Sequence, residues 1–458
     1  MVATVVDADY IVVGAGAAGM AFTDALIEHS DAHVALVDRR AAPGGHWTDA
    51  YPFVRLHQAS AFYGVASTLL GGGRVQTSGP EAGLYERATG AEVCAYYARV
   101  LERMVASGRV TFYPECDYES DGTVMSLASG TRYVARPGCR IVDARYLSPD
   151  IPATTPAPFA SDAGVSVIPV NDVVRDGLGA DQIVIVGSGK TATDAIVWLT
   201  DNGYDPDAIC WVRPRDPWML NRAVVQPDPA VFIGMAADTM IAAAAASSAD
   251  DLFLRLEERG VMLRIDRSVT PTMAKSPTLA AWELERLQQI EHVVRRGHLR
   301  RVEPGRLVLD EGDVTVRKDA LVVHCAAPGL KYPQRVPIWG EDAIRVQPVR
   351  AGFPCFGAAV AGYVEATRSD DEVKNRISPP STLPNTTADW CTMQVLGAQA
   401  TAAFGAEPDI REWVATVALN PAATPPGQLD RSEVADAIAR LGANAPAGLA
   451  RMTELAQA

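Results

Sequence analysis

Tyr10-Ile11-Val12-Val13-Gly14-Ala15-Gly16-Ala17-Ala18-Gly19 is the stretch of this chain that decides the fold. Its apolar first part, residues 10–13, is typical of a buried parallel strand. Residues 17–28 follow as a predicted helix with small residues in its first turn. A strand, a glycine-rich turn and a helix in this order predict the opening of a dinucleotide-binding unit.

The glycines of this stretch have separate physical roles. Gly14 permits the tight turn, Gly16 lets the backbone approach a pyrophosphate, and Gly19 lets the helix pack closely on the strand. The free N–H groups at Ala17 and Ala18, with the positive end of the helix dipole, favour phosphate there. The alternative interpretation is an ordinary turn between a strand and a helix.

An acidic residue favours the dinucleotide interpretation. A second predicted strand, residues 33–37, ends just before Asp38. Asp38 lies about 20 residues past the glycine motif, where a carboxylate usually binds a ribose hydroxyl. We therefore predict that the first site takes an unphosphorylated ribose, as in FAD.

A second glycine-rich turn, Gly187-Ser188-Gly189-Lys190-Thr191-Ala192, follows the apolar run 183–186. A phosphate-binding P-loop is excluded because it needs a glycine at position 184, where the chain has Val184. Ala192 occupies the third glycine position of a dinucleotide turn, which often accepts alanine. The side chain of Lys190 either reaches the phosphates or projects into solvent. The predicted cofactor-binding residues here are Gly187, Gly189, Lys190 and Thr191.

Two arginines distinguish the second site from the first. The predicted strand 208–212 is followed by Arg213 and Arg215, where the first site has an acid. Arginine there favours a 2′-phosphate, through a charge-assisted contact worth about 1.5–3 kcal/mol. The alternative is that both arginines are solvated surface residues. We predict that the second site binds NADPH.

Composition limits the classes of function. A chain of 458 residues predicts two or three domains, and its net charge of −14 argues against a nucleic-acid partner. No basic leader precedes the first strand, and Asp238 interrupts the most apolar helical stretch, residues 235–246, so we expect no membrane span. The seven cysteines form no C-x-x-C pair, which fits a reducing cytoplasm and excludes the usual zinc spacings.

The order of the predicted elements indicates an α/β protein with two Rossmann-like, three-layer dinucleotide-binding domains, the second inserted in the first. Thr89-Gly90-Ala91-Glu92 predicts a helix with a capping box, and residues 110–142 predict a small strand meander. A proline-rich linker, residues 149–158, precedes the second domain. We predict domain bounds of 1–155 and 156–325, with a return to the first domain at 326–458.

The second half of the chain departs from a simple repeat of strands and helices. Residues 217–300 are predicted to form a mostly helical insertion, after which strands return at 306–309 and 320–325. Helices are expected near residues 409–419 and after an Asp430-x-x-Glu433 cap. The segment 346–380 matches no motif with a predicted role.

The first motif continues into Gly44-Gly45-His46-Trp47, with Tyr51-Pro52 shortly after. A Gly-Gly-x-Trp loop followed by Tyr-Pro resembles the class B flavoprotein monooxygenases, which include the flavin-containing and Baeyer–Villiger enzymes. The second turn is similar to the NADPH-site pattern of that family, and the order of the two domains also matches. The resemblance covers most of residues 8–330.

This resemblance implies FAD and NADPH as cofactors and assigns a set of residues to the FAD site. His57 and Gln58 are placed near the flavin ring. The chain departs from the family in one respect, because the fingerprint histidine before the NADPH turn is absent between His57 and His292. The implied FAD-site residues are Gly14, Gly16, Ala17, Ala18, Gly19, Asp38, Arg39, Gly45, His46, Trp47, His57 and Gln58.

The activity that the resemblance implies is an NADPH- and O2-dependent oxygenation of a small organic molecule through a C4a-peroxyflavin. A positive side chain, Arg222 or Arg55, is expected to stabilise that adduct. His57 is expected to donate a proton near neutral pH, or else to form a structural hydrogen bond. The missing histidine favours an alternative, an FAD-dependent reductase, dehydrogenase or oxidase without oxygenation. A third interpretation is a flavin-binding or regulatory protein that catalyses no reaction. Such a protein would not need the second dinucleotide-binding turn.

Overall fold

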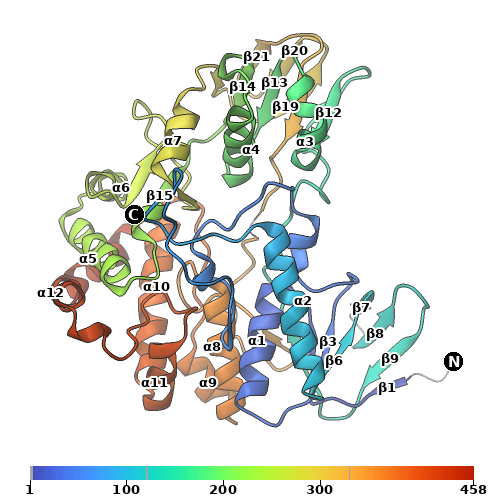
Figure 1. Ribbon diagram of the computed structural model, residues 1–458, viewed down its shortest axis with the longest axis vertical. Coiled ribbons are helices and arrows are strands. Elements are labelled where there is room, and N and C mark those ends of the chain that lie inside the picture. Colours follow the sequence, from blue (N-terminus) through green and yellow to red (C-terminus); the bar gives the residue numbers. More distant parts are fainter. Residues whose placement is uncertain (1–3, 120–121, 330, 458) are drawn as a thin grey trace.

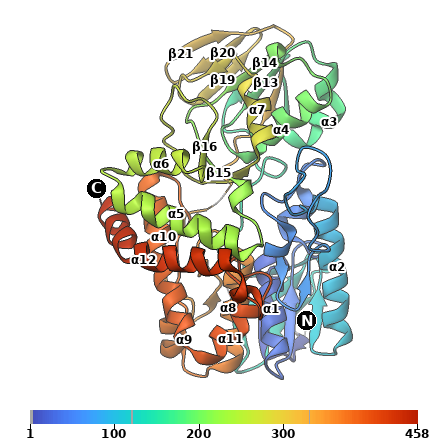
Figure 2. The ribbon, with the colours of Figure 1, turned by 60° about the vertical axis from the view of Figure 1, so that its left-hand side comes forward.

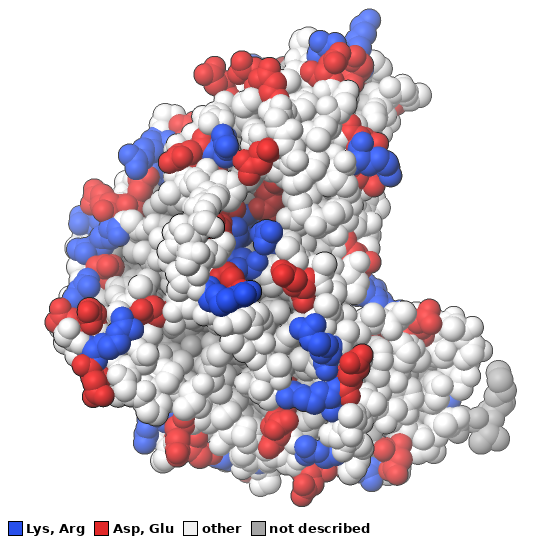
Figure 3. Space-filling model, viewed as in Figure 1, with Lys and Arg blue, Asp and Glu red and all other residues white. Residues whose placement is uncertain are grey.

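The computed structural model describes residues 4–119, 122–329 and 331–457. The fold is α/β, with two Rossmann-like domains stacked along the long axis of the molecule and a helical layer beside them (Figures 1 and 2). No helix in the described ranges is long and apolar enough to cross a membrane. On the face in Figure 3, acidic and basic side chains are interspersed.

The first domain is built on five parallel strands, as the motif at Gly14 predicts. All neighbours in this sheet run parallel, and the C-terminal β23 returns to pair with β10. The order is β23 (Ile344–Arg345), β10 (Arg140–Asp143), β2 (Tyr10–Val13), β3 (Val34–Val37) and β6 (Val110–Tyr113).

Alternation along β2 separates two apolar layers. Val12 packs against the helices α1, α2 and α8, whereas Ile11 and Val13 face a second sheet on the other side. Gly362 lets α8 approach α1 closely, because a Cβ there would lie 2.3 Å from the Phe22 carbonyl oxygen. The covering elements are α1 (Ala17–Glu28), α2 (Gly90–Ala106), α8 (Pro354–Thr367), β1 (Thr4–Val6), β7 (Cys116–Tyr118), β8 (Thr123–Ser126) and β9 (Arg132–Ala135).

The second domain repeats this three-layer design. Ile185 faces its helices, and Val184 and Val186 face a small covering sheet. The central parallel sheet has the order β12 (Ser166–Pro169), β22 (Leu321–His324), β13 (Ile183–Val186), β14 (Ile209–Val212) and β18 (Val293–Val294). The helices are α3 (Val173–Asp176), α4 (Lys190–Asp201) and α7 (Ala281–Gln288), and the covering strands are β11 (Ala160–Ser161), β19 (Leu299–Glu303), β20 (Arg306–Leu309) and β21 (Gly312–Thr315).

Sequence and structure agree on the main elements and differ at their margins. The capping box of Thr89 and Glu92 is confirmed at the start of α2. The predicted meander is confined to β7–β9, because its first and last strands, β6 and β10, join the parallel sheet. The second sheet lies in the sequence between β10 and β23, so the second domain is inserted in the first. The bounds at residues 155 and 325 stay a prediction.

The segment 217–300 is less helical than predicted. It contains α5 (Pro229–Ala245) and α6 (Ala249–Glu258), but also a three-stranded sheet, and its last part supplies α7 and β18 to the second domain. The strands pair at positions far apart in the sequence, so local periodicity did not reveal them. They are β15 (Trp218–Asn221), β16 (Met262–Arg264) and β17 (Thr278–Leu279).

The C-terminal helices form a layer against the insertion. α12 lies along α5 (Figure 2), and a Cβ at Gly448 would lie 2.7 Å from the Met240 carbonyl oxygen. The predicted cap at Asp430 is wrong, because α12 has Arg431 at its N-cap. The helices are α9 (Asp371–Ile377), α10 (Thr387–Gly405), α11 (Pro408–Thr416) and α12 (Ser432–Leu455), and a short hairpin, β4 (Gly64–Val65) and β5 (Thr68–Leu69), lies in the loop before α2.

The returning segment has a structural role at the amino end of the first sheet. Glu365 on α8 is buried and accepts hydrogen bonds from Tyr10 (2.7 Å), Trp339 (2.6 Å) and Lys374 (2.7 Å). Arg140 on β10 donates a further bond to it at 3.0 Å. Because Tyr10 begins β2, this cluster lies at the sheet edge opposite the glycine turn.

Candidate functional site

The first glycine turn has the geometry of a phosphate cradle. Gly14 has φ +107°, and a Cβ at Gly19 would lie 1.8 Å from the Gly14 carbonyl oxygen. α1 begins after Gly16 with no side-chain cap and no acidic residue in its first turn. The N–H groups at the start of α1 therefore meet no competing carboxylate, which fits a phosphate.

Asp38 is bound into this turn. Its Oδ2 accepts from the Ala15 N–H at 2.7 Å, and its Oδ1 accepts from the Arg40 N–H at 2.8 Å. The side chain is buried. Each carboxylate oxygen can accept more than one hydrogen bond, so the ribose contact stays a prediction alongside this structural role.

The Gly-Gly-x-Trp loop lies directly on the first turn. The Gly44 N–H donates to the Ala15 carbonyl at 2.9 Å, and a Cβ at Gly45 would lie 2.9 Å from the Gly16 Cα. The loop needs glycine there because the two backbones touch.

The side chains that follow in this loop are also fixed. Trp47 Nε1 donates to the Tyr63 hydroxyl at 2.6 Å. Burial and the nearby Arg40 charge lower the pKa of His46 to about 4.

The second glycine turn has the same phosphate-binding geometry as the first, but fewer protein atoms surround its middle glycine, Gly189. Gly187 has φ +139°, and its carbonyl accepts from Trp211 Nε1 at 2.7 Å. A Cβ at Gly189 would meet no described atom within 4 Å. α4 also begins without a side-chain cap, and the buried Ser188 hydroxyl has no hydrogen-bond partner in the described part of the chain. These residues fit a second dinucleotide phosphate.

The loop after the first turn packs onto the helix of the second turn. The Tyr51 hydroxyl donates to Asp194 Oδ2 on α4 at 2.7 Å. Phe53 stacks on Trp198 of the same helix, with ring centroids 5.2 Å apart. The structure thus brings the Tyr-Pro segment of the first site against the helix of the second.

Arg213 and Arg215 have different surroundings. Arg213 is buried over the Trp211 ring and pairs with Asp216 at 2.9 Å, while its Nε and Nη1 have no partner among the described residues. Burial lowers the pKa of Arg213 to about 10. Arg215 is half-buried and donates to the Thr272 carbonyl at 2.8 Å and the Asn385 amide oxygen at 3.2 Å. Neither arginine is the fully solvated residue of the alternative interpretation.

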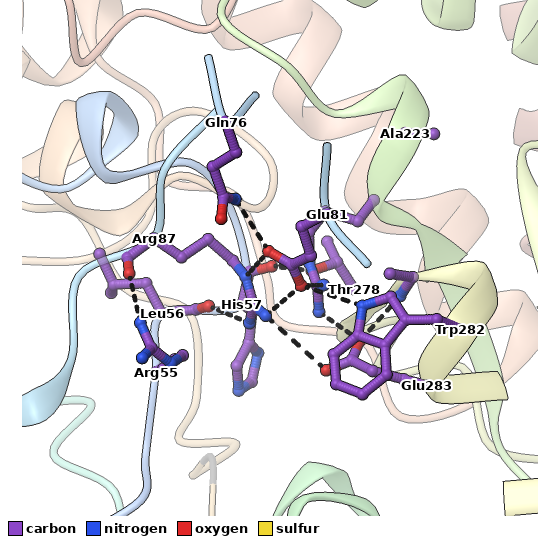
Figure 4. Close-up of polar contacts among 12 residues, drawn as sticks. Arg55, Leu56, His57, Gln76, Glu81, Arg87, Ala223, Thr278, Trp282 and Glu283 are labelled. Carbon is purple, nitrogen blue, oxygen red and sulfur yellow. Dashed lines mark hydrogen bonds and ion pairs between the residues drawn. The ribbon is translucent and has the colours of Figure 1, made fainter. Parts of the chain in front are cut away.

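Arg222 pairs with two carboxylates of a buried charge network between the domains, Glu81 and Glu283, which Figure 4 shows close together. Its side chain is fully buried, with Nη1 2.6 Å from Glu81 and Nη2 2.6 Å from Glu283. Its Nε donates to the His57 carbonyl at 2.9 Å. Glu81 comes from the loop before α2 and Glu283 from α7, so the pairs join the first domain to the second. We call Glu81, Arg87, Lys190, Asp194, Arg222 and Glu283 the interdomain charge network.

Two more cations complete this network. Arg87 pairs with Glu81, and Lys190 pairs with Asp194 and lies 3.5 Å from Glu283. Nearby cations lower the pKa of Glu283 to about 2 despite its burial. The side chain of Lys190 is held by these carboxylates and does not project into solvent, while its contact with the phosphates stays a prediction.

His57 lies beside these cations. Burial, reinforced by the charges of Lys190 and Arg222, lowers the pKa of His57 to about 3. The imidazole is therefore neutral at pH 7 in this structure, and the expectation that His57 donates a proton in the reaction stays a prediction. Its carbonyl is also fixed, by Arg222 and by the Thr278 hydroxyl.

The other predicted residues lie around this centre. Arg55 and Arg39 are exposed, while Gln58 and Thr191 are half-buried. The sequence interpretation missed Glu81, Arg87 and Glu283, whereas Asp194 belongs to the NADPH-site pattern that the second turn resembles. No local motif marks Glu81 or Glu283, because each has partners far away in the chain, such as Arg222, which is 141 residues from Glu81.

A family model and several known proteins are similar to this chain. Residues 12–66 match the family model of the NAD(P)-binding Rossmann-like domain. Over 422 residues the chain is 42% identical to the uncharacterized protein Rv2000 of Mycobacterium tuberculosis strain H37Rv, covering 91% of this chain and 78% of that protein. The chain belongs to the same family as Rv2000.

Two solved structures are similar at low sequence identity. An oxidized steroid monooxygenase bound to NADP is 14% identical, covering 97% of this chain and 98% of its own, with a TM-score of 0.46. Bacillithiol disulfide reductase from Bacillus cereus is 13% identical, covering 80% of this chain and 99% of its own, with a TM-score of 0.44.

The lowered pKa of His57 predicts a pH dependence of stability. Between its ordinary value of 6.5 and about 3, the unfolded chain holds one more proton on His57 than the folded protein does. The free energy of unfolding therefore falls as the pH falls through this window, by at most about 1.4 kcal/mol per pH unit from this group. Denaturant unfolding of His57→Asn across the window should show a shallower pH slope than the unsubstituted protein.

The matched control is His298→Asn, at an exposed histidine. This variant should keep the slope of the unsubstituted protein. Equal slopes for His57→Asn and the unsubstituted protein would show that His57 is not held neutral by the fold.

Proposed function

We propose that this protein is an oxidoreductase that binds FAD at the first turn and NADPH at the second. The observation that carries the proposal is the pair of uncapped glycine turns, each at the carboxyl edge of a parallel sheet and linked by the contact of Tyr51 with Asp194. When bound, the flavin accepts a hydride from the nicotinamide and can react with oxygen once reduced.

The residues of the chain bind and orient these groups. In the first site, the backbone of Gly14, Gly16 and the start of α1 holds the pyrophosphate, and Asp38 holds the ribose. In the second, Gly187, Gly189 and Thr191 hold the phosphates, and Arg213 and Arg215 take the 2′-phosphate. His57, Arg222 and Arg55 are the side chains proposed beside the reacting centre.

We further propose that the reaction is oxygenation of a small organic molecule with O2. The support is the Gly-Gly-x-Trp loop, which resembles that of the class B monooxygenases and here lies directly on the first turn. Reduction or oxidation without oxygenation is the second candidate. Two observations favour it: the missing histidine before the second turn, and the pairing of Arg222 with Glu81 and Glu283, which cancels its charge.

Anaerobic mixing of the purified, FAD-loaded protein with NADPH in a stopped-flow instrument tests the proposal. We expect loss of the oxidised-flavin absorbance, because the nicotinamide reduces the flavin. If the absorbance persists, the assignment of NADPH to the second site is refuted.

Admitting oxygen afterwards separates the two reactions. Oxygenation predicts a delayed return of the oxidised-flavin spectrum, with slow release of hydrogen peroxide in the absence of substrate. An immediate return with one peroxide per NADPH would identify an oxidase instead.

The two arginines give a further prediction about cofactor choice. Arg215→Ala should weaken NADPH at least about tenfold, because one charge-assisted hydrogen bond is worth about 1.5–3 kcal/mol. NADH, which lacks the 2′-phosphate, should bind as before, and titration of both cofactors checks this. Arg213→Ala should follow the same pattern if its guanidinium reaches the phosphate.

The exposed Arg317, at the end of β22 away from the turn, offers a matched control as Arg317→Ala. If the Arg213 or Arg215 variant loses affinity for NADPH and NADH equally, the arginine stabilises the fold and does not bind the 2′-phosphate.

A further inference from the structure

Residues 77–83, which we call the flap, form a loop that extends from the first domain between β5 and α2. Two hydrogen bonds close its base: the Gln76 N–H donates to the Leu84 carbonyl at 2.8 Å, and the Gly83 N–H donates to the Gln76 carbonyl at 2.8 Å. Figures 1 and 2 show the blue loop that contains the flap extending toward α7 of the second domain.

One buried carboxylate anchors the flap. Glu81 is the only buried side chain among residues 77–83, all of which the structure describes. It accepts from Arg222 Nη1 at 2.6 Å and from Trp282 Nε1 of α7 at 3.4 Å, and Figure 4 shows it beside Trp282 and Arg87. The charges of Arg87 and Arg222 lower the pKa of Glu81 despite its burial, so the anchor is ionised at pH 7.

The rest of the flap has few contacts that would hold it in place. Its other residues, 77–80, 82 and 83, are exposed. Gly79 and Gly83, on either side of Glu81, have φ of +76° and +89°, and a Cβ at either position would meet no described atom within 4 Å. The backbone conformation and not crowding therefore favours glycine there, as in a hinge. Segments with few buried apolar contacts open locally at a small cost in free energy.

The flap lies over the interdomain charge network. Besides Glu81, Arg222 pairs with Glu283, which lies 3.5 Å from Lys190 at the second glycine turn. The Nε of Arg222 donates to the carbonyl of His57 from the first domain. Withdrawal of Glu81 would leave the Arg222 charge balanced by one carboxylate in place of two, between the two proposed cofactor sites.

We propose that the flap is a lid over the region between the two glycine turns and that Glu81 is its latch. In the closed form, the pairs of Glu81 with Arg222 and Arg87 hold the lid down. In the open form, Glu81 leaves these partners, solvent reaches Arg222, and a small molecule can enter. The entry of a substrate rests on the proposed function, whereas the movement of the flap does not depend on it.

Hydrogen exchange of the FAD-loaded protein, followed by mass spectrometry without NADPH, tests the lid. The reporter is the Leu84 N–H, which donates to the Glu81 carbonyl at 3.0 Å. In the unsubstituted protein it should exchange by local opening, with a much weaker dependence on denaturant than the amides of α1. Glu81→Gln should speed exchange of residues 77–84 at least about tenfold, because the buried ion pairs that close the lid are lost.

The matched control is Glu341→Gln, at an exposed glutamate outside the flap, which should exchange as the unsubstituted protein does. Native-state proteolysis with thermolysin gives a second measurement. Glu81→Gln should speed cleavage at the Gly83–Leu84 bond, because a protease cuts the open form. Cleavage before Leu429, which is 57% exposed and lies outside the flap, should not change.

Three results would overturn the proposal. If Leu84 exchanges only with the denaturant dependence of α1, the flap does not open on its own. If exchange of the flap is the same with and without Glu81→Gln, Glu81 is not a latch. If Glu81→Gln speeds exchange of α1 and α4 as much as that of the flap, Glu81 supports the whole fold. Failure of the proposed function is distinguishable, because a flavin that NADPH does not reduce leaves these measurements unaffected.

Discussion

The pairing of Arg222 with Glu81 and Glu283 is the interaction on which the arrangement of this molecule depends. A guanidinium with no exposed surface is stable only when its charge is compensated in place. The two compensating carboxylates come from different domains, so the pairs form only when the domains adopt this orientation. Arg87 and Lys190 then balance the remaining charge of Glu81, Glu283 and Asp194.

This constraint bears on the reaction. Lys190 is the first residue of α4, the helix that follows the second glycine turn. Tyr51, from the loop after the first glycine turn, contacts the same helix at Asp194. The network therefore lies between the two proposed cofactor sites. Burial, reinforced by the cations of the network, lowers the pKa of His57 and leaves a neutral imidazole able to donate or accept a hydrogen bond. Under the proposed function, the charge of Arg222 is available to a bound cofactor only if its pairs with Glu81 and Glu283 open.

The sequence predicted the parts of the fold that local chemistry determines. The strands before Gly14 and Gly187, the helices after them and the capping box at Thr89 each depend on residues within one or two turns. The prediction failed where long-range contacts decide. The strands at 218–221 and 262–264 pair across an intervening pair of helices, and the partners of Arg222 lie 141 and 61 residues away. Desolvation of His57 is likewise a property of the assembled domains.

A double-mutant cycle between Arg222 and Glu283 tests most directly whether paired burial of charge holds the domains together. Arg222→Met alone should lower the free energy of unfolding by about 3–5 kcal/mol, because it leaves three carboxylates of the network with only two cations, Arg87 and Lys190. Combining it with Glu283→Gln leaves Arg87 with Glu81 and Lys190 with Asp194. The account predicts that the double variant is destabilised by clearly less than the sum of the single variants, with a coupling of about 1–3 kcal/mol. Additive losses would contradict it.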